Sequence, residues 1–254
     1  MYKLIKIVYN FLIPRVVHYK IEPHLRFLFY FIFHKGNKHH CQICNANLKK
    51  FILINFQSET DNLCPKCGSL SRTRTLYNYI NNEINYSKKD ILDFSPHRSI
   101  YNFFSKNEKN YLANDFNSQF FADTNYDITK LPFRQEKFDL IICFHVLEHV
   151  PDDNKAIENL YKVLRNKGDL LIQVPLKEGV TDEDLSITDP KQREKRFGQR
   201  DHVRVYGELD LETKLKAYGF KTTVVDYSER FQPKELIYYG IKKGELIFHC
   251  KKLS

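Results

Sequence analysis

The chain has 254 residues, and 42% of them are hydrophobic, which suffices for one large domain with a core and a small domain beside it. That hydrophobic content excludes a disordered chain. The longest uninterrupted apolar run, Phe27 to Phe33, has only seven residues, well below the roughly 18 that a membrane-spanning helix needs. The net charge of +9 is concentrated at one end, because residues 1–50 hold nine Lys or Arg and a single acid, Glu22.

Residues 1–38 predict an apolar, basic N-terminal arm. Lys3, Lys6 and Asn10 recur at helical spacing, as a narrow polar stripe on an apolar helix that Pro14 stops or kinks. A signal peptide is not expected, since no small-x-small cleavage site follows the apolar stretch. Two interpretations stay open. The arm makes peripheral contact with a membrane surface, or it packs on the body of the protein or on a second copy.

Two C-x-x-C pairs, nineteen residues apart, predict a small zinc-binding module over residues 39–75. Cys41 with Cys44, and Cys64 with Cys67, supply the four thiolates of a tetrahedral structural Zn²⁺ site. Iron in a rubredoxin-like site and redox disulfides are the alternatives. A thiolate metal site favours a reducing, cytoplasmic location, with the arm at the inner face of the membrane if it binds lipid.

The role of this module is open between two interpretations. In the first, zinc stabilises a segment that is too small to have a core of its own. In the second, the module binds an anionic substrate with help from Arg72 and Arg74.

From Asp90 the chain alternates strand and helix patterns, which predicts that residues 76–254 form one α/β domain with a doubly wound parallel sheet. A helical pattern over 69–85 precedes it. Gly168 is expected to close the helix whose apolar stripe runs from Ala156 to Leu164. The polar segment 176–209 shows no periodicity. The expected strands are 90–94, 111–115, 137–146, 169–175, 221–228 and 244–250, with a helix over 210–220.

Polar groups follow the expected strands at the edge where a doubly wound sheet binds its ligands. Ser95 is expected to cap the helix after the first strand, with Pro96 at its first position. Asp115 ends the next strand, 22 residues after Asp93, a position that suits an acid bridging ribose hydroxyls. Asp127 lies near a third strand end.

The stretch from Asp127 to Val174 contains D-x-x-x-L-P-F, F-D-L-I-I, V-L-E-H-V and G-D-L-L-I-Q-V-P in this order. With these motifs, roughly residues 88–252 resemble the class I S-adenosylmethionine-dependent methyltransferases of the type 11-like group. The resemblance implies a seven-stranded Rossmann-like sheet, with its last two strands closing antiparallel, and S-adenosylmethionine as cofactor.

The same resemblance assigns cofactor contacts residue by residue. Asp93, Phe94 and Ser95 would line the methionine end, and Asp115 would hold the ribose. Asp127 and Ile128 would meet the adenine. His145 would line the side where the methyl group is transferred.

Two departures from the family pattern stand out. The loop after the first strand, Asp93 to Arg98, lacks the usual D-x-G-x-G glycines and has a proline, as in a similar subset of zinc-module methyltransferases. Only eleven residues separate Asp115 from Asp127, so this crossover has no room for a full helix.

The segment 197–207 follows the last core strand, where these enzymes often place a substrate loop, and the similar subset has a comparable D-H-V-R segment. Asp201, Arg204 and Tyr206 are the predicted substrate-binding residues. His202 is the first candidate for a catalytic base and His145 the second. A polar surface loop is the alternative interpretation of this segment.

Three functions follow as hypotheses. The favoured one is methyl transfer to a small molecule or saccharide intermediate. The second is RNA methylation, with the zinc module and basic arm on phosphates, although the body of the chain is nearly neutral. The third is a non-catalytic binding protein, against which Asp115 and Asp127 argue.

Overall fold

A computed structural model describes residues 15–56, 59–118 and 121–253. Their contacts divide the chain into two compact units. The first contains the residues up to Arg74 together with Phe231–Lys242, and the second contains Thr75–Arg230 together with Lys243–Ser254. The sequence predicts a boundary after residue 75, and the contacts divide the chain after Arg74. The segment Phe231–Lys242, however, groups with the first unit, whereas the sequence assigns it to the large domain.

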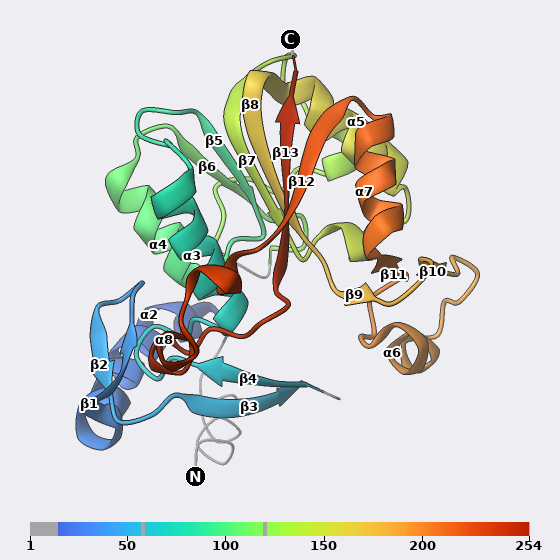
Figure 1. The fold of residues 1–254 in the computed structure, drawn as a ribbon. Helices are drawn as coiled ribbons and strands as arrows, with labels where there is room; N and C mark the ends of the chain where they lie inside the picture. The colour runs from blue at the N-terminus through green and yellow to red at the C-terminus, as the bar shows by residue number, and fades with distance from the viewer. Residues whose placement is uncertain (1–14, 57–58, 119–120, 254) are drawn as a thin grey trace. The chain divides into compact units, whose positions relative to one another are not determined.

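The first unit is built from short elements. Helix α2 (Arg15–Phe29) continues into the π-helical turn η1 (Tyr30–His34), and Lys3, Lys6, Asn10 and Pro14 lie outside the described residues. Two antiparallel hairpins follow, and the helix α8 belongs to this unit (Figure 1). These elements are β1 (Lys35–Cys41), β2 (Ala46–Leu48), β3 (Ile52–Phe56), β4 (Glu59–Leu63) and α8 (Pro233–Tyr239).

The buried core of the first unit is small. It consists of Tyr30, Cys41, Ala46, Leu48, Phe51 and Cys64. Two of these six are cysteines of the C-x-x-C pairs, so the core depends on the chemistry of those thiols. In the described part of the chain, no helix has both the length and the apolarity to cross a bilayer.

The second unit contains a six-stranded sheet in the order β12-β13-β8-β7-β5-β6 (Figure 1). The four strands from β8 to β6 are mutually parallel, while β13 is antiparallel to both β8 and β12. The predicted parallel-rich α/β sheet and the antiparallel pairing of the last two strands are thereby confirmed. The strands are β5 (Ile91–Phe94), β6 (Tyr111–Asn114), β7 (Phe138–Phe144), β8 (Leu164–Gln173), β12 (Phe220–Asp226) and β13 (Leu246–Lys252).

The predicted count of seven strands is wrong for the described residues. Beyond β6 the sheet continues only as an isolated parallel bridge between Asn114 and Thr124. The physical reason is the short connection between Asp115 and Asp127, which leaves too few residues for both a crossover and a paired strand.

Helices cover both faces of this sheet. Figure 1 shows α3 (Ser71–Glu83) and α4 (Arg98–Asn107) on one side, and α5 (Asp153–Val163) and α7 (Glu208–Ala217) on the other. The largest buried cluster includes strand residues such as Ile141 and Ile172 and helix residues such as Leu160 and Leu215. This is the doubly wound arrangement, in which ligands bind at the carboxyl ends of the strands.

Two predicted helix boundaries are wrong. Helix α5 ends at Val163 and the chain enters β8 directly at Leu164, so Gly168 lies inside a strand and closes no helix. Helix α4 is capped by His97, whose Nδ1 accepts a hydrogen bond from the Ser99 N–H, and not by Ser95.

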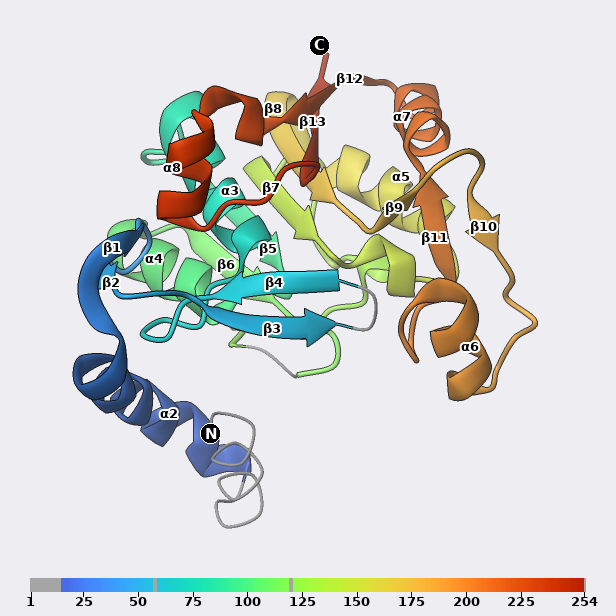
Figure 2. The ribbon, with the colours of Figure 1, turned by 60° about the horizontal axis from the view of Figure 1, so that its bottom comes forward.

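The polar segment 176–209 is more ordered than its sequence suggests. It contains β9 (Leu176–Lys177), β10 (Asp182–Glu183), α6 (Pro190–Phe197) and β11 (Arg204–Gly207). Its three strands form a small separate sheet in the order β10-β11-β9 (Figure 2). Such two- to four-residue strands carry too short a pattern to be recognised from sequence.

Candidate functional site

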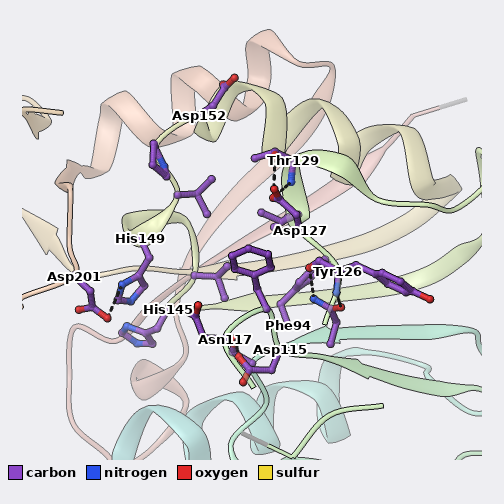
Figure 3. Close-up of a pocket in the computed structure, with 17 residues that line it drawn as sticks. Phe94, Asp115, Asn117, Tyr126, Asp127, Thr129, His145, His149, Asp152 and Asp201 are labelled. Carbon is purple, nitrogen blue, oxygen red and sulfur yellow. Dashed lines mark hydrogen bonds and ion pairs between the residues drawn. The ribbon is translucent and has the colours of Figure 1, made fainter. Parts of the chain in front are cut away.

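A cavity of about 490 Å³ opens at the carboxyl ends of β5, β6 and β7, within the second unit (Figure 3). This size is typical of small-molecule sites. Its walls come from five segments that are far apart in sequence. They are Phe94 and Ser95; Asn114, Asp115, Phe116 and Asn117; Tyr126, Asp127, Ile128 and Thr129; His145, Val146, His149, Val150, Pro151 and Asp152; and Asp201.

The turn after β5 approaches the turn after β6. Ser95 has a φ of 49°, in the left-handed region that favours glycine, at the position where the family loop has its first glycine. Its N–H donates to the Asn114 carbonyl at 2.7 Å, and its hydroxyl donates to Asp115 Oδ1 at 2.8 Å. The chain therefore makes a glycine-like turn with a serine, and the serine hydroxyl orients the buried Asp115 carboxylate.

The region from Asn114 to Thr129 forms the neighbouring wall. The Asn114 side chain bonds both backbone polar groups of Tyr126, at 2.7 and 3.0 Å, and so fixes Tyr126 beside the cavity (Figure 3). Asp127 caps the short 3₁₀ helix η2 (Ile128–Lys130), and its Oδ1 accepts from both the N–H and the hydroxyl of Thr129 at 2.8 Å.

Asp93 differs from the other predicted cofactor residues because it does not line the cavity. Its side chain is 2% exposed, and Oδ2 accepts a hydrogen bond from the Tyr111 hydroxyl at 3.0 Å. Burial raises the pKa of this carboxyl from 3.8 to about 8, despite the opposing effect of the tyrosine. The structure therefore places Asp93 in the core beneath the strand end, while Phe94, Ser95, Asp115, Asp127, Ile128 and His145 all line the cavity.

Two histidines stand at the other end of the cavity. His145 follows β7 with a φ of 55°, and its Nδ1 lies 3.2 Å from Oε1 of Glu148. Glu148 is fully buried in the 3₁₀ turn η3 (Leu147–His149). Burial alone would raise the pKa of the Glu148 carboxyl, but the His145 hydrogen bond and the nearby imidazoles outweigh burial and lower it.

His149 lies beside Asp201 and His202. Figure 3 shows its imidazole facing Asp201, with 3.3 Å between His149 Nδ1 and Asp201 Oδ2. The rings of His149 and His202 meet edge to face, with centroids 4.6 Å apart. His149 itself forms part of the cavity wall.

His202, the first candidate base, is not among the residues that line the cavity. It is 2% exposed, and its Nδ1 lies 3.0 Å from the Phe197 carbonyl oxygen. Burial lowers the pKa of this imidazole. A base role for His202 stays a prediction.

Of the three predicted substrate residues, only Asp201 reaches the cavity. Arg204 is fully buried and donates to the carbonyls of Leu147, Val150 and Pro151. The Tyr206 hydroxyl donates to Asp153 Oδ2 at 2.6 Å. Arg204 and Tyr206 therefore brace the turn that carries His149.

The residues that the sequence missed are mainly Phe116, Asn117, Tyr126, Thr129 and Asp152. Each lies within a few positions of a predicted strand end or a motif residue. Most of them are close in sequence to Asp115 or Asp127, so this closeness could have marked them as candidates for the cavity wall. Which of their side chains turn inward depends on the turn geometry, which the sequence pattern does not reveal.

The four cysteines gather in the first unit. Cys41 Sγ lies 3.7 Å from Cys67 Sγ, and Cys44 Sγ lies 3.7 Å from Cys64 Sγ, so none of the four forms a disulfide. One ligand atom from each residue lies within 4.8 Å of all the others. This arrangement is consistent with the predicted zinc module.

Arg74 lies next to this cluster and is fully buried. Its guanidinium donates to the carbonyls of Asn62, Ser69, Tyr239 and Gly240 and stacks on the Phe51 ring at 4.4 Å. With its donors used in this way, Arg74 holds the first unit together. The alternative in which Arg74 grips an anionic substrate lacks support from this geometry.

Comparison with known proteins agrees with the fold. A solved structure titled the [4+2]-cyclase SpnF superposes with a TM-score of 0.50 over 92% of this chain and 93% of its own, at 13% identity. The YcgJ protein of Bacillus subtilis gives 0.49 over 71% of this chain and 99% of its own, at 15% identity. At these identities the likeness concerns the fold.

Curated relatives match shorter stretches. A tRNA U34 carboxymethyltransferase of Nautilia profundicola is 29% identical over 127 residues, 44% of this chain and 42% of its own. An uncharacterised protein of Methanocaldococcus jannaschii is 39% identical over 59 residues, 23% of this chain and 26% of its own. The matches thus span less than half of either relative. The model of a methyltransferase domain family matches residues 58–225, well over half of the chain. The chain belongs to this methyltransferase domain family.

Proposed function

We propose that the cavity binds S-adenosylmethionine along the β5–β6 side and a small-molecule or saccharide acceptor at the histidine end. The buried Asp115 carboxylate, oriented by Ser95, has the chemistry to accept hydrogen bonds from two ribose hydroxyls. Ile128 and Tyr126 offer apolar and aromatic surface to an adenine. Phe94 and Ser95 then take the methionine end, and His145 faces the methyl group.

The observation that carries the choice of acceptor is the charge of the cavity wall. Four of its residues are aspartates, and none of the described residues that line it is Lys or Arg. A neutral or hydroxyl-rich acceptor fits such a wall, whereas a phosphate backbone would be repelled. The partial match to a tRNA-modifying enzyme keeps RNA as the second candidate.

Methyl transfer from a sulfonium depends mainly on in-line positioning and exclusion of water. In this proposal His145 accepts the proton of an acceptor hydroxyl, since it lines the cavity and an imidazole can serve as a general base. His202 contributes by supporting His149.

Calorimetry with S-adenosylhomocysteine tests the cofactor assignment. Binding should weaken at least tenfold in Asp115→Asn, while Glu158→Gln, an exposed acid paired with Lys155, should bind like the unmodified chain. Equal affinities in all three proteins would overturn the assignment. For the acceptor, steeply salt-dependent binding of RNA would promote the second candidate.

We also propose that the four cysteines hold a structural Zn²⁺. Zinc–sulfur bonds of about 2.3 Å in a tetrahedron place neighbouring sulfurs about 3.8 Å apart, close to the 3.7 Å between the sulfurs of Cys41 and Cys67 and between those of Cys44 and Cys64. Ser69 Oγ lies 3.2 Å from Cys67 Sγ and 3.4 Å from Cys41 Sγ, where a hydroxyl can donate to a thiolate. Metal analysis of the reduced protein should find one tightly held zinc, and its absence would overturn this model.

Peripheral contact of residues 1–38 with an anionic membrane is the third part of the proposal. At the end of α2 and in η1, Phe27, Leu28, Phe31, Ile32 and Phe33 are all about half exposed. Arg26 precedes this run and Lys35 follows it, with the Lys35 ammonium 4.9 Å from the centre of the Phe31 ring. Exposed apolar side chains flanked by cations suit a lipid headgroup region. Flotation with phosphatidylglycerol vesicles should recover the chain, and Phe31→Ser with Ile32→Ser should reduce recovery.

A further inference from the structure

A second cluster of metal-binding side chains lies at the histidine end of the cavity, apart from the cysteines. Glu148, His149 and His202 each offer a ligand atom, and these atoms lie within 4.8 Å of one another. Two imidazoles and one carboxylate are a common ligand set for divalent ions of the first transition row, and such sites keep coordination positions open.

The hydrogen bonds around His202 prepare it as a ligand. Its Nδ1 lies 3.0 Å from the Phe197 carbonyl oxygen, which can only accept, so the proton sits on Nδ1 and Nε2 presents a lone pair. His202 Nε2 is buried and, among the described residues, has no hydrogen-bond partner. Leaving such an atom unpaired costs free energy, which a bound cation would recover.

The Glu148 carboxylate is in a similar position. The side chain is fully buried, and Oε2 has no hydrogen-bond partner in the described part of the chain. Oε1 lies 3.2 Å from His145 Nδ1, which fixes the direction of the carboxylate. A buried carboxylate with an unused oxygen beside two imidazoles is a group that needs a positive charge.

His149 links the cluster to the cavity. Its Nδ1 lies 3.3 Å from Asp201 Oδ2, the carboxylate–histidine arrangement that usually orients metal ligands from outside the coordination shell. His149 and Asp201 both line the cavity, while Glu148 and His202 are buried behind it. A cation held by all three residues would therefore face the acceptor end.

The supporting strand gives the cluster its rigidity. The Val203 N–H donates to the Glu148 carbonyl at 2.9 Å, and Arg204 holds the carbonyls at both ends of the η3 turn. His202 immediately precedes these residues, so the strand and the turn are fixed to each other on either side of the three ligands.

We propose that Glu148, His149 and His202 form a site for a divalent transition-metal ion, such as Zn²⁺ or Fe²⁺, at the acceptor end of the cavity. The open coordination positions take water or an oxygen of the acceptor, and coordination lowers the pKa of that oxygen's proton. This site is separate from the cysteines, which lie in the other unit.

Cobalt binding tests the site without reference to methyl transfer or to the cofactor. The full chain, reduced and saturated with one equivalent of zinc, is titrated with Co²⁺ and followed by calorimetry and by visible absorption. We expect one additional cobalt per chain with a weak absorption typical of nitrogen and oxygen ligands. Cobalt that displaced zinc from the cysteines would instead show intense sulfur charge-transfer bands.

Variants locate the additional cobalt. Glu148→Gln and His202→Ala should lose it, and Asp201→Asn should bind it ten- to a hundredfold more weakly. His24→Ala, which removes an exposed histidine of α2, should bind it unchanged. His149→Ala supplies the decisive measurement if a buried variant does not fold, because His149 is partly exposed. Absence of the additional cobalt in the unmodified chain, or its persistence in His149→Ala and Glu148→Gln, would overturn the proposal.

Discussion

The hydroxyl of Ser95 donates to Asp115 Oδ1 at 2.8 Å, and this bond joins the turns after two adjacent strands. It forms only because Ser95 adopts a φ of 49°. A glycine would make the same turn without strain but could not form the bond. With serine at this position, the turn is strained, and the hydrogen bond holds the Asp115 carboxylate in one orientation.

The strained turn at Ser95 predicts that two substitutions of this residue differ in stability. Ser95→Gly should relieve left-handed strain and Ser95→Ala should keep it, while both lose the hydrogen bond. Ser95→Gly should therefore be the more stable variant by about 1 kcal/mol in urea unfolding. Both should bind S-adenosylhomocysteine more weakly than the unmodified chain. A Ser95→Ala protein as stable as Ser95→Gly would contradict this account of the turn.

Asp93 predicts a pH-dependent stability. Its pKa is about 8 in the folded chain and 3.8 ordinarily, so between these values the folded state keeps a proton that the unfolded state has released. Stability from this group therefore falls as pH rises from about 4 to 8 and levels off above. Asp93→Asn removes the effect. Its stability relative to the unmodified chain should improve with pH, by at most roughly 1.4 kcal/mol per unit. A constant difference between pH 5 and 8 would refute the burial effect.

Asp169 should give folding stability the opposite pH dependence, with a loss at acid pH. Burial opposes ionisation of its carboxyl. The hydrogen bond between His249 Nε2 and Asp169 Oδ1, 2.8 Å long, outweighs burial together with the charges of Lys251 and Lys89, and the pKa of Asp169 falls from 3.8 to about 2. This stability is present above pH 4 and is lost as pH falls towards 2. Asp169→Asn should lose roughly 2 kcal/mol at pH 7 and much less near pH 2. Urea unfolding at both pH values measures this, and an equal loss at both would count against the ion pairs.

Arg204 predicts a structural loss with a consequence at the site. Arg204→Ala removes the guanidinium donors to the carbonyls of Leu147, Val150 and Pro151 and should cost roughly 2–4 kcal/mol of stability. Arg200→Ala, at a 67% exposed side chain, is the matched control and should be neutral. Thermal unfolding compares the two variants. Similar melting temperatures would show that Arg204 does not brace the turn.

In the first unit, Arg74 should support the cysteine cluster as Arg204 supports the turn in the second unit. Arg74→Ala removes donors to four backbone carbonyls next to the cysteines, so we expect weaker zinc retention as well as lower thermal stability. Zinc release to a chelator at fixed concentration measures the first effect. Arg72→Ala is the control, because none of the described hydrogen bonds of this cluster involves Arg72. Equal release rates would mean that Arg74 does not support the thiolates.

Local patterns in the sequence were enough for several features. Apolar runs such as Leu140 to Ile142 predict buried strands because a strand covered on both faces needs apolar side chains throughout. The C-x-x-C spacing predicts the cysteine cluster because a two-residue turn brings both sulfurs to one point. Asp115 and Asp127 could be expected in one site because parallel strands end at the same edge.

Tertiary structure decided what the residues between the motifs do. The segment 197–207 resembles a substrate loop because it is rich in polar side chains. In the structure, however, Arg204 turns inward to backbone carbonyls such as that of Pro151, and Tyr206 turns inward to Asp153. Likewise, Ser95 lies in the turn and does not cap helix α4, and His97 caps this helix instead. Sequence spacing determines which strand end a residue follows, but the direction of its side chain depends on which buried partners remain unsatisfied. Those partners come from distant segments, so only the folded chain brings His202 beside Glu148 and His149.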